Sequence, residues 1–98
     1  MNIYSVVAPV TGELFTTLFE NKKVKISQII SSDEVTPVEY CQQEDEWLVV
    51  VRGSATLIID GEETKLSQGD TFFIPAQLVH QVTKTEQGTL WLTVHISI

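Results

Sequence analysis

Most of the chain alternates apolar and polar positions with the period of two that is typical of β-strands. From residue 23 onward this alternation predicts strands at about 24–30, 47–51, 55–59, 71–75, 78–83 and 90–98. The run Trp47 to Val51 is continuously apolar, so we expect that strand to be covered on both faces. Closely spaced strands of this kind predict an all-β antiparallel sandwich or barrel.

The first 22 residues show a different spacing. One apolar stripe at helical spacing is formed by Leu14, Phe15, Leu18 and Phe19. Thr11 could cap the start of such a helix and Asn21 could end it. We therefore expect one domain over residues 1–98, with an extended segment and a short helix in 1–22 and a β-barrel in 23–98.

Tight turns are indicated where the chain must reverse between strands. Asp60-Gly61 predicts a two-residue hairpin turn of a primed type. Gly53 and Gly69 stand where strands reverse, so we expect positive φ angles at both.

Composition and charge narrow the possible functions. The chain has 98 residues, 43% of them apolar, with a formal net charge of −7. The apolar content argues against a disordered chain. The negative charge argues against nucleic acids and anionic membrane surfaces as partners. The single cysteine, Cys41, excludes an internal disulfide, and the N-terminus has neither a basic region nor a long apolar run. We expect a small acidic protein of the cytoplasm.

Two stretches of the chain carry a family resemblance. Glu46 is followed after six residues by Gly53, and Gly69 opens a second stretch that contains Pro75 and His80. These positions resemble the two signature motifs of the cupins, small β-barrels of the jelly-roll type. The resemblance covers roughly residues 24–97, and it implies a jelly-roll barrel with His80 on an inner face.

The resemblance also raises the question of a metal ion. Metal-binding cupins hold one divalent cation with a His-x-His pair, a Glu and a second-motif His. Here Glu46 and His80 match two of those four positions. The places of the His-x-His pair are taken by Glu39 and Cys41 in one register, or by Tyr40 and Gln42 in the other. The pair is therefore lost in either register.

Two hypotheses follow from this altered motif. In the first, Glu39, Cys41, Glu46 and His80 form a variant site for Zn, Fe, Mn or Ni in a metal-dependent enzyme. In the second, the chain is a non-catalytic module that binds a small molecule or a protein partner and has lost the metal. Cys41 is then a small buried hydrophobic residue.

Aromatic and polar residues near these positions could line a ligand pocket. The candidates are Gln42, Tyr40, His95 and Trp91. Trp91 and His95 share one face of the last strand, which lines either a cavity or, as is commoner, the outer surface. If Glu46 points inward, Trp47 points outward and needs a cover, either the helix or a second subunit. We expect a homodimer.

Overall fold

The computed structural model describes all 98 residues and consists of eight strands without a helix. In chain order the strands are β1 (Glu13–Glu20), β2 (Val24–Ser31), β3 (Asp45–Arg52), β4 (Ser54–Ile59), β5 (Glu62–Ser67), β6 (Thr71–Ile74), β7 (His80–Thr85) and β8 (Thr89–Ile96). The all-β prediction is confirmed. Since the fold has no helix, it contains none that is long and apolar enough to cross a membrane.

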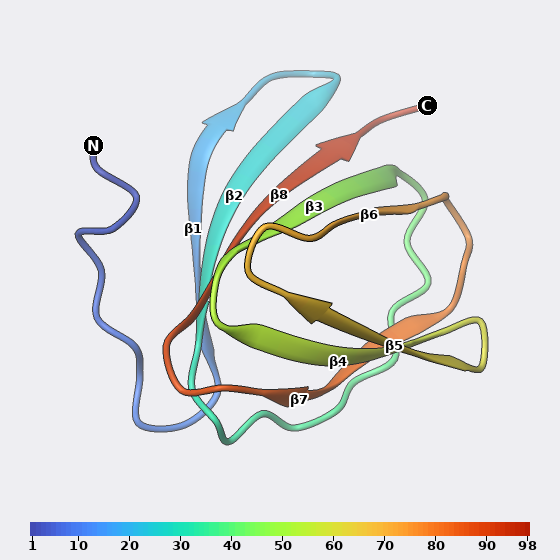
Figure 1. Cartoon of the computed structure of the whole chain (residues 1–98). Helices are drawn as coiled ribbons and strands as arrows, with labels where there is room; N and C mark the ends of the chain where they lie inside the picture. Colours follow the sequence, from blue (N-terminus) through green and yellow to red (C-terminus); the bar gives the residue numbers. More distant parts are fainter.

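The strands form two antiparallel sheets that face each other (Figure 1). The larger sheet has the order β1-β2-β8-β3-β6, and the smaller has the order β5-β4-β7. Alternate side chains of each strand point between the sheets and form the core. The fully buried core cluster comprises Leu48, Val50, Ala55, Leu57, Ile59, Leu66, Ile74 and Trp91.

The predicted N-terminal helix was wrong, because its residues form the edge strand β1. A helix of this length is marginal by itself, whereas β1 completes its backbone hydrogen bonds along β2 from Glu13 to Glu20. A bulge between Thr17 and Phe19 inserts one extra residue. This shift brings Leu14 and Phe19 to the same face of the sheet although they are five apart.

The predicted turns are confirmed by the backbone angles. Asp60 and Gly61 have φ of 50° and 80°, as a two-residue primed turn requires. Gly53 has φ of 90°, and a Cβ at this position would lie 2.6 Å from Thr89 Oγ1. Only glycine therefore suits the β3–β4 connection.

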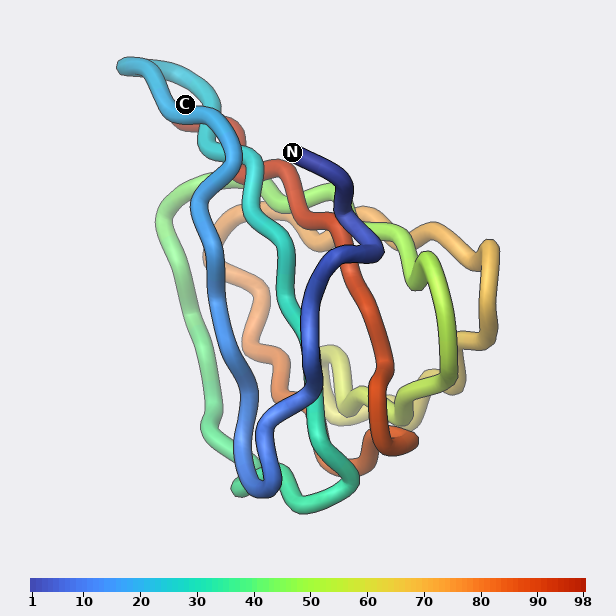
Figure 2. The backbone as a smooth tube through the Cα atoms, turned by 90° about the vertical axis from the view of Figure 1, so that its left-hand side faces the viewer, coloured from blue at the N-terminus to red at the C-terminus, as the bar shows by residue number.

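The outer face of the larger sheet is covered only in part. Figure 2 shows the N-terminal segment, residues 1–10, crossing in front of β2 and β8. The Gln28 side chain donates a hydrogen bond to the carbonyl oxygen of Ile3, which ties the segment to β2. Trp47 and its cross-strand neighbour Phe73 remain 38% and 49% exposed. No helix covers them.

Candidate functional site

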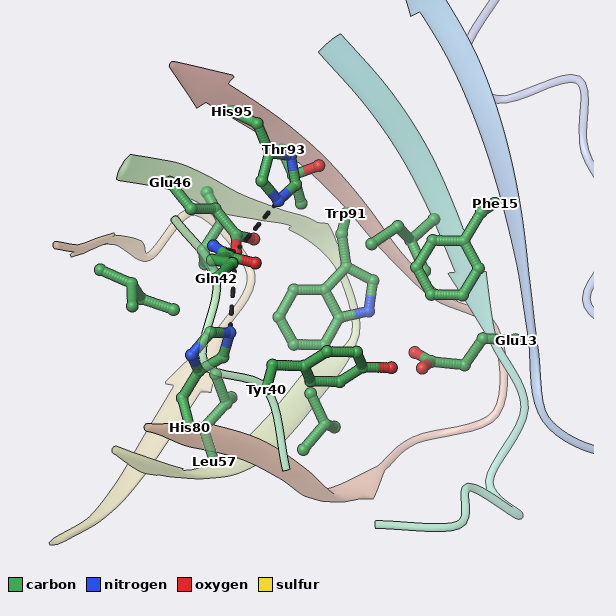
Figure 3. A pocket seen from close by; sticks show the side chains of 14 residues that line it. Glu13, Phe15, Tyr40, Gln42, Glu46, Leu57, His80, Trp91, Thr93 and His95 are labelled. Carbon is green, nitrogen blue, oxygen red and sulfur yellow. Dashed lines mark hydrogen bonds and ion pairs between the residues drawn. The ribbon is translucent and has the colours of Figure 1, made fainter. Parts of the chain in front are cut away.

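A cavity of about 110 Å³ lies between the two sheets (Figure 3). Its lining combines eight hydrophobic residues with six polar ones. The residues are Glu13, Phe15, Ile29, Tyr40, Gln42, Glu46, Leu48, Leu57, Ile74, His80, Val82, Trp91, Thr93 and His95. A cavity of this size has room for several waters or a small organic molecule.

Glu46 is the centre of the polar end of the cavity. It stands at the start of β3 and is only 7% exposed. Its Oε1 atom accepts a hydrogen bond from Gln42 Nε2 at 2.8 Å and lies 3.3 Å from His95 Nε2. His80 Nε2 lies 3.8 Å from the same oxygen. Three side chains from separate parts of the chain thus converge on one carboxylate oxygen.

The convergence keeps Glu46 ionised in spite of its burial. Burial by itself raises the pKa of a carboxyl group because it penalises the charged form. The hydrogen bonds from His95 and Gln42, with the charge of the two histidines, outweigh that penalty, and the pKa of Glu46 is lowered from 4.5. The site therefore contains a buried carboxylate anion.

His95 pairs directly with Glu46 across the ladder between β8 and β3. Its hydrogen bond to Glu46 raises its pKa above 6.5; burial opposes this shift, and the charges of Glu46 and Glu44 add to it. The face of β8 that carries Trp91 and His95 lines the cavity and not the outer surface. On that face His95 Nδ1 and Thr93 Oγ1 are buried without a hydrogen-bond partner.

His80 is oriented by two contacts at the start of β7. Its Nδ1 atom lies 3.0 Å from the carbonyl oxygen of Leu78. Because a carbonyl oxygen can only accept, Nδ1 carries a proton, and Nε2 is the ring nitrogen that faces Glu46. The backbones of Tyr40 and His80 exchange two hydrogen bonds, and their rings stack at 5.7 Å.

The structure shows which register replaces the His-x-His pair. Tyr40 and Gln42 line the cavity beside Glu46 and His80. Glu39 and Cys41 are exposed and do not line it, and the Cys41 thiol donates to the Gln77 carbonyl oxygen at 3.4 Å. No group of three His, Cys, Asp or Glu side chains is arranged to hold a metal ion. The variant donor set suggested by the sequence does not fit a metal ion in this structure.

The opposite end of the cavity holds a second polar chain that the sequence did not reveal. The indole Nε1 of Trp91 donates to Ser31 Oγ at 3.0 Å, and the Ser31 hydroxyl donates to Glu13 Oε2. Phe15, from the same strand as Glu13, lies beside them. Both β1 residues fall in the segment predicted as helix, so no strand alternation was available to direct them inward.

The family assignment follows from the sequence profile that matches residues 26–95, described as "Cupin domain". This chain belongs to the cupin family. The match includes both signature motifs and ends at His95, so nearly all of the site lies within the cupin region. Glu13 and Phe15 precede it.

Solved structures share the fold of this chain. A protein of Ralstonia eutropha JMP134, named "putative mannose-6-phosphate isomerase", shares 35% identity, with a TM-score of 0.90 over 100% of this cupin and 97% of that chain. An RmlC-like cupin from Shewanella frigidimarina has a TM-score of 0.80 at 20% identity, covering 89% of this chain and 78% of that one. The second likeness concerns the fold alone.

A curated relative is an uncharacterised protein of Aquifex aeolicus (strain VF5). It is 31% identical over 75 residues, which are 76% of this cupin. The chain spans 62% of the length of that relative.

Proposed function

We propose that this cupin binds a small organic molecule in the barrel cavity and removes a proton from it, with His80 as the base. The observation that carries the proposal is the orientation of His80. Its Nδ1 proton is held by the Leu78 carbonyl, which leaves Nε2 facing the cavity 3.8 Å from the Glu46 carboxylate. In the proposed reactant state Nε2 is unprotonated. A general base must lie within hydrogen-bond reach of the proton that it removes, and a proton taken up by Nε2 would lie beside the Glu46 carboxylate.

In the proposed step the X–H bond of the bound molecule breaks and a bond from the proton to His80 Nε2 forms. The bonding electrons stay on the bound molecule. Glu46 stabilises the imidazolium that results, because opposite charges attract strongly in a site of low dielectric constant. Gln42 and His95 both contact the Glu46 carboxylate and hold it in place, so they act as positioning residues.

Proton removal can be tested before the natural substrate is known. Dihydroxyacetone is a suitable probe because it is small and has C–H bonds beside a carbonyl group. In D2O we expect the protein to catalyse deuterium incorporation, measured by NMR, and His80→Gln to remove most of it. Typical general-base contributions are about 10²- to 10⁴-fold in rate.

Two control variants make this test specific. Cys41 is exposed and lies outside the cavity. The Cys41→Ala variant should therefore catalyse deuterium exchange at the wild-type rate. Glu46→Gln should slow exchange as well, since the imidazolium loses its counter-charge. Wild-type exchange no faster than that of His80→Gln would contradict the proposed base.

We further propose that the step needs no resident metal ion. Glu39 and Cys41 do not approach Glu46, and Glu46 Oε1 already accepts a hydrogen bond from Gln42. Elemental analysis of the purified protein should give well under one metal ion per chain, and EDTA should leave the exchange rate unchanged. A stoichiometric Zn, Fe, Mn or Ni ion that is lost in His80→Ala would overturn this part of the proposal.

The outer face of the larger sheet supports a homodimer. The ladder registers align one apolar row across all five strands, and its members are Phe73, Trp47, Val94, Ile26 and Phe19. The row has no charged member and is half-buried or exposed throughout. An uncharged row on a molecule with net charge −7 can pack against its own copy with little repulsion, as a two-fold interface requires.

Sedimentation of the full chain tests the dimer. The wild type should sediment as a dimer at micromolar concentration, and Trp47→Glu should be a folded monomer because it buries a charge at the centre of the interface. Val79→Glu is a matched control at an exposed apolar residue just before β7 of the smaller sheet. Equal mass for the wild type and Trp47→Glu would contradict this interface.

A further inference from the structure

The end of the cavity opposite Glu46 combines aromatic rings with a carboxylate. Figure 3 shows the rings of Trp91, Tyr40 and Phe15 around one space, with the Glu13 carboxylate at its edge. Tyr40 and Phe15 are 45% and 62% exposed, so they stand at the mouth, whereas Trp91 is 2% exposed and forms the inner wall. Of these residues only Tyr40 also contacts His80, through ring stacking and its backbone.

The hydrogen bonds at this end determine which part of Trp91 meets a ligand. Its only N–H is donated to Ser31, and Ser31 in turn donates to Glu13 Oε2. The indole therefore cannot donate to a bound molecule and offers its ring surface. The π-face of an aromatic ring carries partial negative charge and attracts cations.

A carboxylate stands at each end of the cavity. Its lining contains the two carboxylates Glu13 and Glu46 and neither lysine nor arginine. Glu13 Oε1 accepts no hydrogen bond from the protein, so it is free to meet a ligand. The two histidines of the lining, His80 and His95, both lie at the Glu46 end. Nothing in the lining resembles the arginine or lysine clusters that recognise phosphate groups.

We propose that this end of the cavity is a subsite for an organic ammonium group, held between the aromatic rings of Trp91, Tyr40 and Phe15 and the Glu13 carboxylate. The inference rests on the proposed ligand site and adds the charge of its ligand. It also separates this chain from what the name of the Ralstonia protein suggests, because a sugar phosphate would place its anionic group against two carboxylates.

Choline and 3,3-dimethylbutan-1-ol form a matched pair of probes for this subsite. They have nearly the same shape, but only choline carries a positive charge. We expect choline to bind the full-length protein at least about tenfold more tightly than the neutral alcohol, and to shift the Trp91 indole N–H resonance in NMR titrations. Mannose 6-phosphate should cause no shift at that resonance.

Glu13→Gln provides the decisive variant because it removes the charge and keeps an acceptor for Ser31. The preference for choline should fall by about tenfold in this variant. Glu63→Gln, on an exposed position of β5, removes the same charge away from the cavity and should leave the preference unchanged. Circular dichroism of both variants verifies that they are folded.

Several results would overturn the subsite. Equal affinity for both probes would show that charge is not recognised, and equal effects of Glu13→Gln and Glu63→Gln would show only a long-range field. Failure of choline to bind would also overturn it. These outcomes are separate from the deuterium exchange test, which depends on His80 and can succeed or fail with the choline preference intact.

Discussion

The two faces of the five-stranded sheet each hold an exception to the ordinary distribution of polar and apolar residues. The inner face buries charged and polar side chains, with Glu46 at 7% and Thr93 at 1% exposure. The outer face exposes large aromatic ones, with Trp47 at 38% and Phe73 at 49%. Buried polar groups and exposed apolar rows are the informative exceptions to hydrophobic burial.

The difference shows how each face is stabilised. On the inner face the buried carboxylate of Glu46 is tolerated because Gln42 and His95 satisfy it. On the outer face Trp47 has only its neighbours in the row and no second layer above it. The inner face is thus self-sufficient within one chain, whereas the outer face is what we expect of an interface.

The largest expected effect is on the free energy of unfolding, and it is seen when the two tryptophans, one on each face, are compared. Trp91→Ala removes a 2% exposed ring from the core and should lower the free energy of unfolding by about 3–5 kcal/mol. Trp47→Ala removes a ring that is 38% exposed and should cost about 1 kcal/mol in the monomer. Urea denaturation at low protein concentration measures both. Equal losses would mean that the two faces are equally buried.

A second prediction concerns pH and the Glu46–His95 pair on the inner face. The lowered pKa of Glu46 stabilises the fold above about pH 4.5, and this contribution is lost as pH falls through the lowered value. The raised pKa of His95 stabilises the fold fully below pH 6.5, and this contribution is lost as pH rises through the raised value. The pair therefore contributes fully only between about pH 4.5 and 6.5.

Urea midpoints measured from pH 6 to 9 test the His95 part. The wild type should lose stability over this range, and His95→Gln should lose less because the titrating group is gone. Glu46→Gln should flatten the curve too, since it removes the charge that raises the pKa of His95. A wild-type slope retained in His95→Gln would show that other groups cause the loss.

Features that depend on neighbours in the chain could be predicted from the sequence, whereas those that depend on distant pairing could not. Alternation was sufficient for β2, β3 and β8, and turn chemistry was sufficient for Asp60-Gly61, because each depends on neighbours in the chain. Motif spacing could indicate Glu46 and His80 for the same reason. Glu13 could not be found in this way, because its position depends on pairing with Ser31, 18 residues away.

His95 was a pocket candidate from the sequence, but the orientation of its strand could not be decided there. Its strand has one purely apolar face and one mixed face, and a mixed face is more often the exposed one. Here the apolar face, with Val94, points outward and the mixed face points into the cavity. Only the pairing of His95 with Glu46 across β8 and β3 distinguishes the two orientations, and that pairing joins residues 49 positions apart.

The smallest expected effect is a difference in stability between variants of two buried threonines on the inner face of β8. Thr93 is 1% exposed and its hydroxyl has no partner. Thr89 is fully buried, and its hydroxyl donates to the carbonyl oxygens of Ser54 and Glu86. Thr93→Val should therefore be neutral or stabilise by up to about 1 kcal/mol, whereas Thr89→Val should cost about 1–3 kcal/mol because it removes the buried hydrogen bonds of the hydroxyl, including the one it accepts from the Ser54 N–H. Because both changes replace the same group in the same strand, a loss in Thr93→Val as large as that in Thr89→Val would show that the Thr93 hydroxyl is paired, and that the inner face holds a polar contact beyond those of Glu46.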